Sequence, residues 1–242
     1  MKYTHYVALG DSMSIDLYPS LDLDADVEEL PVGAASLLYR NHDATWPKMS
    51  GVDLATRFAG IEFCNLAADG ARTIDVEGPQ LSKLRARVPA GAAAVVTLTA
   101  GGNDLLLAFD ADDHLDRATR DAAVHVGRCV EGILAHLPGA VVLVTTVYDP
   151  TDGSGVLPGD EEQLGQLPVE YLFDFNDRVR DLANGERVRV ADAQRHFRGR
   201  GADAVEDERW YWPDNPIEPG ARGAHELRRL WLATLDGPES EA

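Results

Sequence analysis

The sequence predicts an α/β protein with a parallel sheet at its centre. Five apolar stretches have the length of strands, and four of them are apolar almost without interruption. Such continuous runs are typical of strands that helices cover on both faces. Segments with helical periodicity separate these stretches, and the alternation predicts a layered α/β fold. The expected strands are residues 5–9, 61–66, 93–99, 140–146 and 187–191, of which 61–66 is the weakest.

The expected helices lie between these strands and after the last one. They cover residues 74–87, 119–137, 169–183 and 219–235. Pro138-Gly139 and Asn184-Gly185 follow two of them, and such pairs are typical stop signals. Pro219 suits the first turn of the last helix, because the N–H that proline lacks has no partner within the helix there.

The length of the chain favours one domain. A single α/β sheet with its helices accounts for 242 residues without a second core. We therefore expect one domain over residues 1–236. Residues 17–53 break the regular alternation and contain three prolines, so we interpret them as an insertion between the first and second strands. The last residues, 237–242, are expected to form a disordered tail.

The charge balance argues against two classes of partner. The chain has 22 Lys and Arg against 41 Asp and Glu, which gives a formal net charge of −19. Nucleic acid and anionic membranes repel such a surface, so we expect neither as a partner. Because the chain begins without a leader pattern and no apolar run approaches about 18 residues, a cytoplasmic protein is expected. The sequence predicts nothing about the oligomeric state.

Two cysteines, Cys64 and Cys129, lie in apolar surroundings. A disulfide framework is typical of shorter chains with more cysteines, so we expect both thiols to be reduced.

Small and polar residues follow three of the predicted strands. Gly10-Asp11-Ser12 comes directly after the first strand, Gly70 lies in the loop after the second, and Asn103 follows the third. In an open parallel sheet, ligands bind beyond the carboxyl ends of the strands. We therefore expect Ser12, Gly70 and Asn103 to converge at one edge of the sheet.

These three residues suit acyl transfer. Ser12 would attack a carbonyl carbon, and the backbone N–H groups of Ser12 and Gly70, with the Asn103 amide, would stabilise the oxyanion. Gly70 would let the ester oxygen approach the backbone closely. Each residue also has an ordinary interpretation, since Asp11, Ser12 and Asn103 can cap helices and Gly70 can form a turn. We expect Asp11 to support the turn rather than to take part in the chemistry.

The segments "GDSMS", "NLAADG" and "GGND" together resemble the first three blocks of the SGNH (GDSL-type) hydrolases, in the same order and at similar spacing. The resemblance extends over nearly the whole chain. It implies a flavodoxin-like three-layer α/β/α sandwich with a five-stranded parallel sheet in the order 2-1-3-4-5. It also implies hydrolysis of small-molecule, lipid or acylated-sugar esters, without a metal or organic cofactor.

The chain departs from this family at its fourth block. The family has Asp-x-x-His-Pro before the last helix, where the histidine is the general base and the aspartate orients it. Here Glu218 stands before Pro219 in place of the histidine, and Asp214 lies four residues earlier, one more than usual.

Three explanations of this departure remain open. Glu218 could be the base if burial, for example beneath the aromatic residues 210–212, raises its pKa. Another histidine could replace it; the candidates are His196, His225 and His42, although His225 is expected to face solvent. Alternatively the chemistry is lost, and the protein is a non-catalytic module that binds an acylated or glycosylated ligand. A nucleotide-binding protein is less favoured, because no glycine-rich phosphate loop follows a strand.

Overall fold

The structure is a computed structural model that describes residues 3–111, 114–158 and 166–237. Its centre is a five-stranded sheet in the order β2-β1-β3-β4-β5, and every neighbouring pair is parallel. This confirms the predicted fold class and strand order. The strands are β1 (His5–Gly10), β2 (Glu62–Asn65), β3 (Ala94–Thr99), β4 (Val141–Thr145) and β5 (Val188–Ala191), each close to its expected range.

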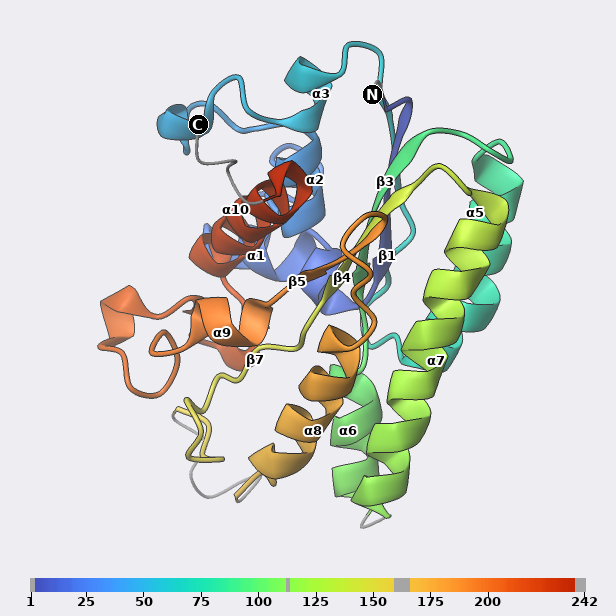
Figure 1. Ribbon diagram of the computed structural model, residues 1–242. Helices are drawn as coiled ribbons and strands as arrows, with labels where there is room; N and C mark the ends of the chain where they lie inside the picture. Colours follow the sequence, from blue (N-terminus) through green and yellow to red (C-terminus); the bar gives the residue numbers. More distant parts are fainter. Residues whose placement is uncertain (1–2, 112–113, 159–165, 238–242) are drawn as a thin grey trace, which may run out of the picture.

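Helices cover both faces of the sheet, which makes three layers (Figure 1). Alternate residues of one strand belong to different cores: Val7 and Leu9 pack on one face, and Tyr6 packs on the other. The first core includes α5 (Leu81–Arg87), α6 (Gly102–Asp110), α7 (Leu115–His136) and α8 (Val169–Arg180); the second includes α2 (Ala34–Tyr39), α9 (Ala193–Phe197) and α10 (Ala221–Asp236). Burial on both faces explains the continuous apolar runs of the sequence.

The expected helix over residues 74–87 is interrupted. It consists of α4 (Thr73–Asp75), a π-helical turn over Val76–Gln80, and α5. Pro79 lies inside the π turn. Proline removes a donor and clashes with the carbonyl of the preceding helical turn, and an inserted residue relieves this conflict.

The last helix begins later than predicted. Pro219 does not open it, because this residue ends β7 (Asn215–Pro219), which pairs antiparallel with β6 (Tyr211–Trp212). Gly220 is the N-cap residue, and α10 begins at Ala221. The Ala221 N–H donates to the Asp22 carboxylate at 2.8 Å, so the cap comes from a residue remote in the sequence.

The expected insertion contributes to one layer of the sandwich. It contains α1 (Leu17–Asp22), α2 and a 3₁₀ turn over Pro47–Met49, and α3 (Leu54–Arg57) follows it. The guanidinium of the buried Arg228 on α10 donates to Asn41 Oδ1 at 2.8 Å and to the Leu37 carbonyl oxygen at 3.3 Å. These contacts tie the segment to the last helix.

The end of the chain and the two cysteines bear on two further expectations. Gly237 is the C-cap of α10, while residues 238–242 of the expected tail lie outside the described residues. Cys64 and Cys129 are both free thiols, as expected. Within the described ranges, none of the helices combines the length and apolar character needed to cross a membrane.

Candidate active site

The first strand ends in a turn that only glycine can open. Gly10 has φ +131°, and a Cβ there would lie 1.8 Å from the carbonyl oxygen of Thr99. Asp11 then caps a 3₁₀ turn over Ser12–Ser14, because its carboxylate accepts a hydrogen bond from the Met13 N–H at 3.2 Å. This turn presents Ser12 beyond the carboxyl end of β1.

Gln80 fixes the same turn from the π-helical segment. Its side-chain oxygen accepts from the Gly10 N–H at 2.7 Å, and its amide nitrogen donates to the Gly10 carbonyl at 2.7 Å. Both groups are buried, so the pair would cost several kcal/mol to leave unsatisfied. No local pattern singles out Gln80, because its partner is the backbone of a distant glycine.

The loops that carry Gly70 and Asn103 are joined. The Asn103 amide donates to the Ala71 carbonyl at 3.0 Å, and Asp104 accepts from the Thr73 hydroxyl at 2.7 Å. An amide nitrogen has two N–H groups, so Asn103 keeps a second donor. Gly70 has φ +65°, and a Cβ there would meet nothing within 4 Å. No neighbouring atom of the described residues would clash with a Cβ at Gly70. The left-handed backbone conformation is therefore what favours glycine at this position.

Glu218 lies at the end of β7 beside Ser12. The carboxyl is buried, with 8% of the residue exposed, and the Ser12 side chain lies near enough to influence its pKa. Burial raises the pKa of Glu218 to about 7; the Ser12 side chain lowers it, and the charges of Asp11 and Asp69 raise it. Its Oε2 has no hydrogen-bond partner among the described residues.

Other acidic groups surround this pair. Burial raises the pKa of Asp11 to about 6, although hydrogen bonds from Thr99 and from the Met13 N–H lower it. The Tyr18 hydroxyl donates to Asp69 at 3.0 Å, and burial, Asp69 and Glu218 together raise the pKa of Tyr18 to about 12. The site is therefore acidic, and each ionised carboxylate makes its neighbours harder to ionise.

The aromatic segment before β7 supports Glu218 indirectly. Trp210 and Tyr211 are buried in the core beneath α10, so their role is packing. Tyr211 packs edge-on against Tyr148, whose hydroxyl donates to the Ile217 carbonyl at 3.0 Å. This bond fixes the residue that precedes Glu218. The sequence assigns Tyr148 no role, because only its position in the fold shows the hydrogen bond to the Ile217 carbonyl.

The alternative base candidates make other contacts. His196 Nε2 lies 3.1 Å from Glu226 Oε2 on α10. His225 is half-buried rather than facing solvent as expected; its ring stacks on Trp46, and burial and the neighbouring Arg228 lower its pKa to about 4.

Two further candidates, Asp214 and His42, lie in other surroundings: Asp214 is exposed, and His42 hydrogen-bonds to Thr45. Asp214 is an exposed residue between the paired Trp212 and Asn215 of the β6–β7 hairpin. His42 Nδ1 hydrogen-bonds the Thr45 hydroxyl at 2.6 Å. In the part of the chain that the structure describes, no group of three or more His, Cys, Asp or Glu residues could hold a metal ion.

A parallel sheet in the order 2-1-3-4-5, flanked by helices, is consistent with the SGNH/GDSL α/β fold. A model of the GDSL-like lipase/acylhydrolase family matches residues 8–225. The chain belongs to this family. Family membership supports an ester hydrolase.

Solved structures share the fold at low sequence identity. An extracellular lipase from Streptomyces rimosus superposes with a TM-score of 0.65 at 21% identity, over 96% of this chain and 99% of the lipase. A lipase from a goat rumen metagenome gives 0.64 at 18%, over 97% and 98%. An acetyl xylan esterase from Geobacillus stearothermophilus gives 0.62 at 12%, over 96% of each chain. A search of curated protein sequences finds no match to this chain.

Proposed function

We propose that the protein hydrolyses carboxylic esters with Ser12 as the nucleophile and Glu218 as the general base. The observation that carries this proposal is the buried Glu218 carboxyl, which lies beside the buried Ser12 side chain and has a pKa of about 7. A carboxylate with an ordinary pKa near 4.3 is a poor base for a serine hydroxyl. Near neutral pH, a carboxyl group with a pKa of about 7 is about half ionised. Its ionised form holds a proton more strongly than a carboxylate with the ordinary pKa does.

The first half of the reaction forms an acyl-enzyme. Ser12 Oγ attacks the carbonyl carbon while its proton passes to Glu218, and the carbonyl electron pair moves to the oxygen. The Ser12 and Gly70 N–H groups and the second Asn103 N–H would hold this oxyanion. When the carbonyl re-forms, the ester C–O bond breaks, and Glu218 returns its proton to the departing alcohol.

The second half consumes water. Glu218 takes a proton from the water that attacks the acyl carbon, and the resulting tetrahedral species expels Ser12, which recovers its proton from Glu218. The free carboxylic acid then leaves and ionises in solvent. An anionic product beside Asp11, Asp69 and Glu218 is repelled, which favours its release. The proposed cycle uses this chain's own residues and one water.

The family and the structural neighbours support a proposal for the substrate class. The similar structures include lipases and an acetyl xylan esterase, so esters of lipids or acylated sugars are the candidate substrates. The acidic surface and site make neutral esters more suitable than anionic ones.

Hydrolysis of p-nitrophenyl acetate and butyrate by the purified protein tests the proposal. Ser12→Ala should abolish release of p-nitrophenol, whereas Ser82→Ala, on the exposed face of α5, should match the wild type. Activity that survives Ser12→Ala would contradict the assignment of the nucleophile. If the wild type hydrolyses neither ester but binds a neutral acylated sugar, the protein is instead a binding module on this fold.

A further inference from the structure

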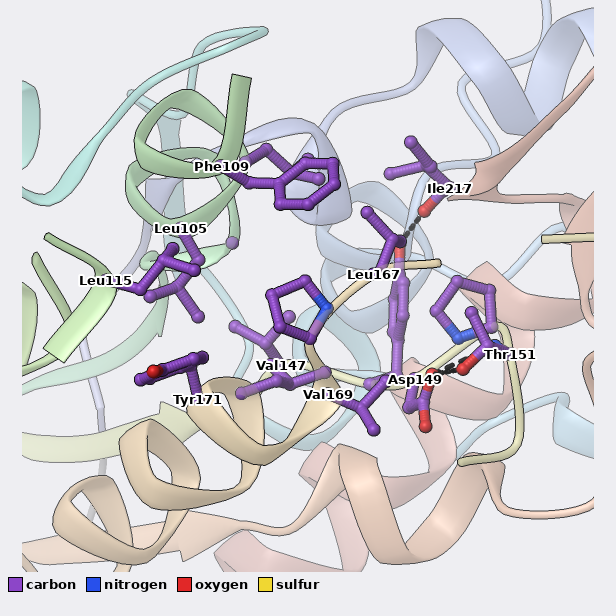
Figure 2. Close-up of a pocket in the computed structure, with 16 residues that line it drawn as sticks. Leu105, Phe109, Leu115, Val147, Asp149, Thr151, Leu167, Val169, Tyr171 and Ile217 are labelled. Carbon is purple, nitrogen blue, oxygen red and sulfur yellow. Dashed lines mark hydrogen bonds between the residues drawn. The ribbon is translucent and has the colours of Figure 1, made fainter. Parts of the chain in front are cut away.

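An apolar cavity of about 110 Å³ lies beside the candidate active site (Figure 2). Residues of α6, the loop after β4 and the start of α8 form most of its wall. Figure 2 shows Ile217 on one side of the cavity and Leu105 and Leu115 on the opposite side. The wall includes Leu105, Phe109, Val147, Leu167, Tyr171 and Ile217.

The cavity adjoins the proposed catalytic groups through the backbone. Gly102, in its wall, immediately precedes Asn103, and Ile217 immediately precedes Glu218. Tyr148 also lines it and hydrogen-bonds the Ile217 carbonyl oxygen at 3.0 Å. The wall of the cavity therefore continues directly into the segments that carry Asn103 and Glu218.

Two polar side chains of the wall, Asp149 and Thr151, are already engaged with each other. The Asp149 carboxylate accepts from the Thr151 hydroxyl at 2.6 Å, from the Thr151 N–H at 2.9 Å and from the Gly153 N–H at 2.7 Å. The Thr151 hydroxyl in turn accepts from the Gly155 N–H at 3.0 Å. Since a sugar or a charged head group needs free polar partners, this wall is suited to hydrocarbon.

We propose that this cavity binds the acyl chain of the substrate and selects esters of about five to six acyl carbons. The inference rests on the proposed function of Ser12. An apolar cavity of about 150 Å³ accommodates benzene with its six carbons, so a cavity of 110 Å³ takes roughly four methylene or methyl groups. With the carbonyl carbon at Ser12, the cavity is filled by a pentanoyl or hexanoyl chain.

The placement of α6 favours the acyl chain over the alcohol. Asn103 lies in the first turn of α6, and Leu105 and Phe109 of the same helix line the cavity. A carbonyl held at Asn103 therefore directs its chain along α6. The departing alcohol must reach the proton on Glu218, and of the described wall residues only Ile217 comes from β7.

A series of p-nitrophenyl esters with two to ten acyl carbons tests the length. Each buried methylene should raise kcat/KM about fourfold. We expect hexanoate to exceed acetate by on the order of 10²-fold and decanoate to give no further gain. A flat series, or one that rises steadily to decanoate, would overturn the proposal. A series of alkyl acetates in which alcohol length raises kcat/KM, while acyl length does not, would assign the cavity to the alcohol.

Leu105→Phe should fill the cavity and lower the hexanoate-to-acetate ratio of kcat/KM at least about tenfold. Leu107→Phe is the matched control, because Leu107 is 49% exposed on the same helix, and its ratio should equal that of the wild type. If Leu105→Phe fails to fold, Leu105→Ala should move the preferred chain length upward. A ratio and an optimum that neither Leu105 variant changes would contradict the proposal.

Binding to the Ser12→Ala variant separates this inference from the proposed function. Hexanamide, a neutral compound with the same acyl chain, should bind this variant in a calorimetric titration, and Leu105→Phe should remove the binding. If hexanamide binds in this way but no ester is hydrolysed, the proposed function fails and the cavity assignment stands. If esters are hydrolysed but hexanamide does not bind, the cavity assignment fails alone.

Discussion

Asp11 illustrates how one neighbouring residue can tune the proposed base. Its carboxyl is buried, and its charge raises the pKa of Glu218. It also caps the turn that presents Ser12. Asparagine caps such turns as well as aspartate does, so the charge can be removed while the turn is kept.

We expect Asp11→Asn to shift the pH dependence of kcat/KM to lower pH. The base must be ionised, so activity is present above the pKa of Glu218, about 7, and falls as the pH drops through it. Without the charge of Asp11 that pKa falls, and activity persists to lower pH. Asp214→Asn, at the exposed hairpin turn, is the control and should leave the profile unchanged. An unchanged or upward-shifted profile for Asp11→Asn would refute this coupling.

The elements show what sequence patterns can and cannot predict. The central strands were found from apolar runs, because burial on both faces leaves a local signature. The edge strand β2 has one exposed and three half-buried residues, which explains why its pattern is the weakest. The start of α10 was predicted wrongly at Pro219, because the cap comes from Asp22 at the other end of the chain. The β6–β7 hairpin was missed for a similar reason, since its short strands are stabilised by packing beneath α10.

The contribution of Asp22 to the stability of α10 can be measured. Asp22→Ala removes the carboxylate that accepts from the Ala221 N–H, and loss of such a cap costs about 1 kcal/mol of the free energy of unfolding. Because α10 begins two residues after Pro219, we also expect a lower kcat from a less well fixed Glu218. Denaturant unfolding and ester hydrolysis measure the two effects. Glu28→Ala, at a nearby exposed glutamate, should change neither; equal effects would argue against the cap.

The candidate site was predictable in part. Ser12, Gly70, Asn103 and Glu218 were selected because the chain follows, or departs at one residue from, a family pattern. Gln80 and Tyr148 were not, because they act through backbone atoms of distant residues. The catalytic assignments themselves stay predictions, while the family and the fold are confirmed.

The negative charge of the whole protein should favour cationic substrates over anionic ones. The net charge of −19 and the carboxyls near Ser12 create a negative potential at the site. We expect acetate esters of cationic alcohols to show a kcat/KM at least about tenfold above that of anionic analogues at low ionic strength. The difference should shrink at about 1 M salt, where charges are screened over roughly 3 Å. A preference for anionic esters would contradict this expectation.

Glu218→Gln tests whether Glu218 takes the proton of Ser12. Glutamine keeps the shape of the side chain and removes its basicity, so kcat for p-nitrophenyl butyrate should fall by ~10²-fold or more. Glu131→Gln, on the exposed face of α7, should retain wild-type kcat. If Glu218→Gln is as active as the wild type while His196→Ala or His225→Ala is inactive, a histidine is the base and Glu218 is not.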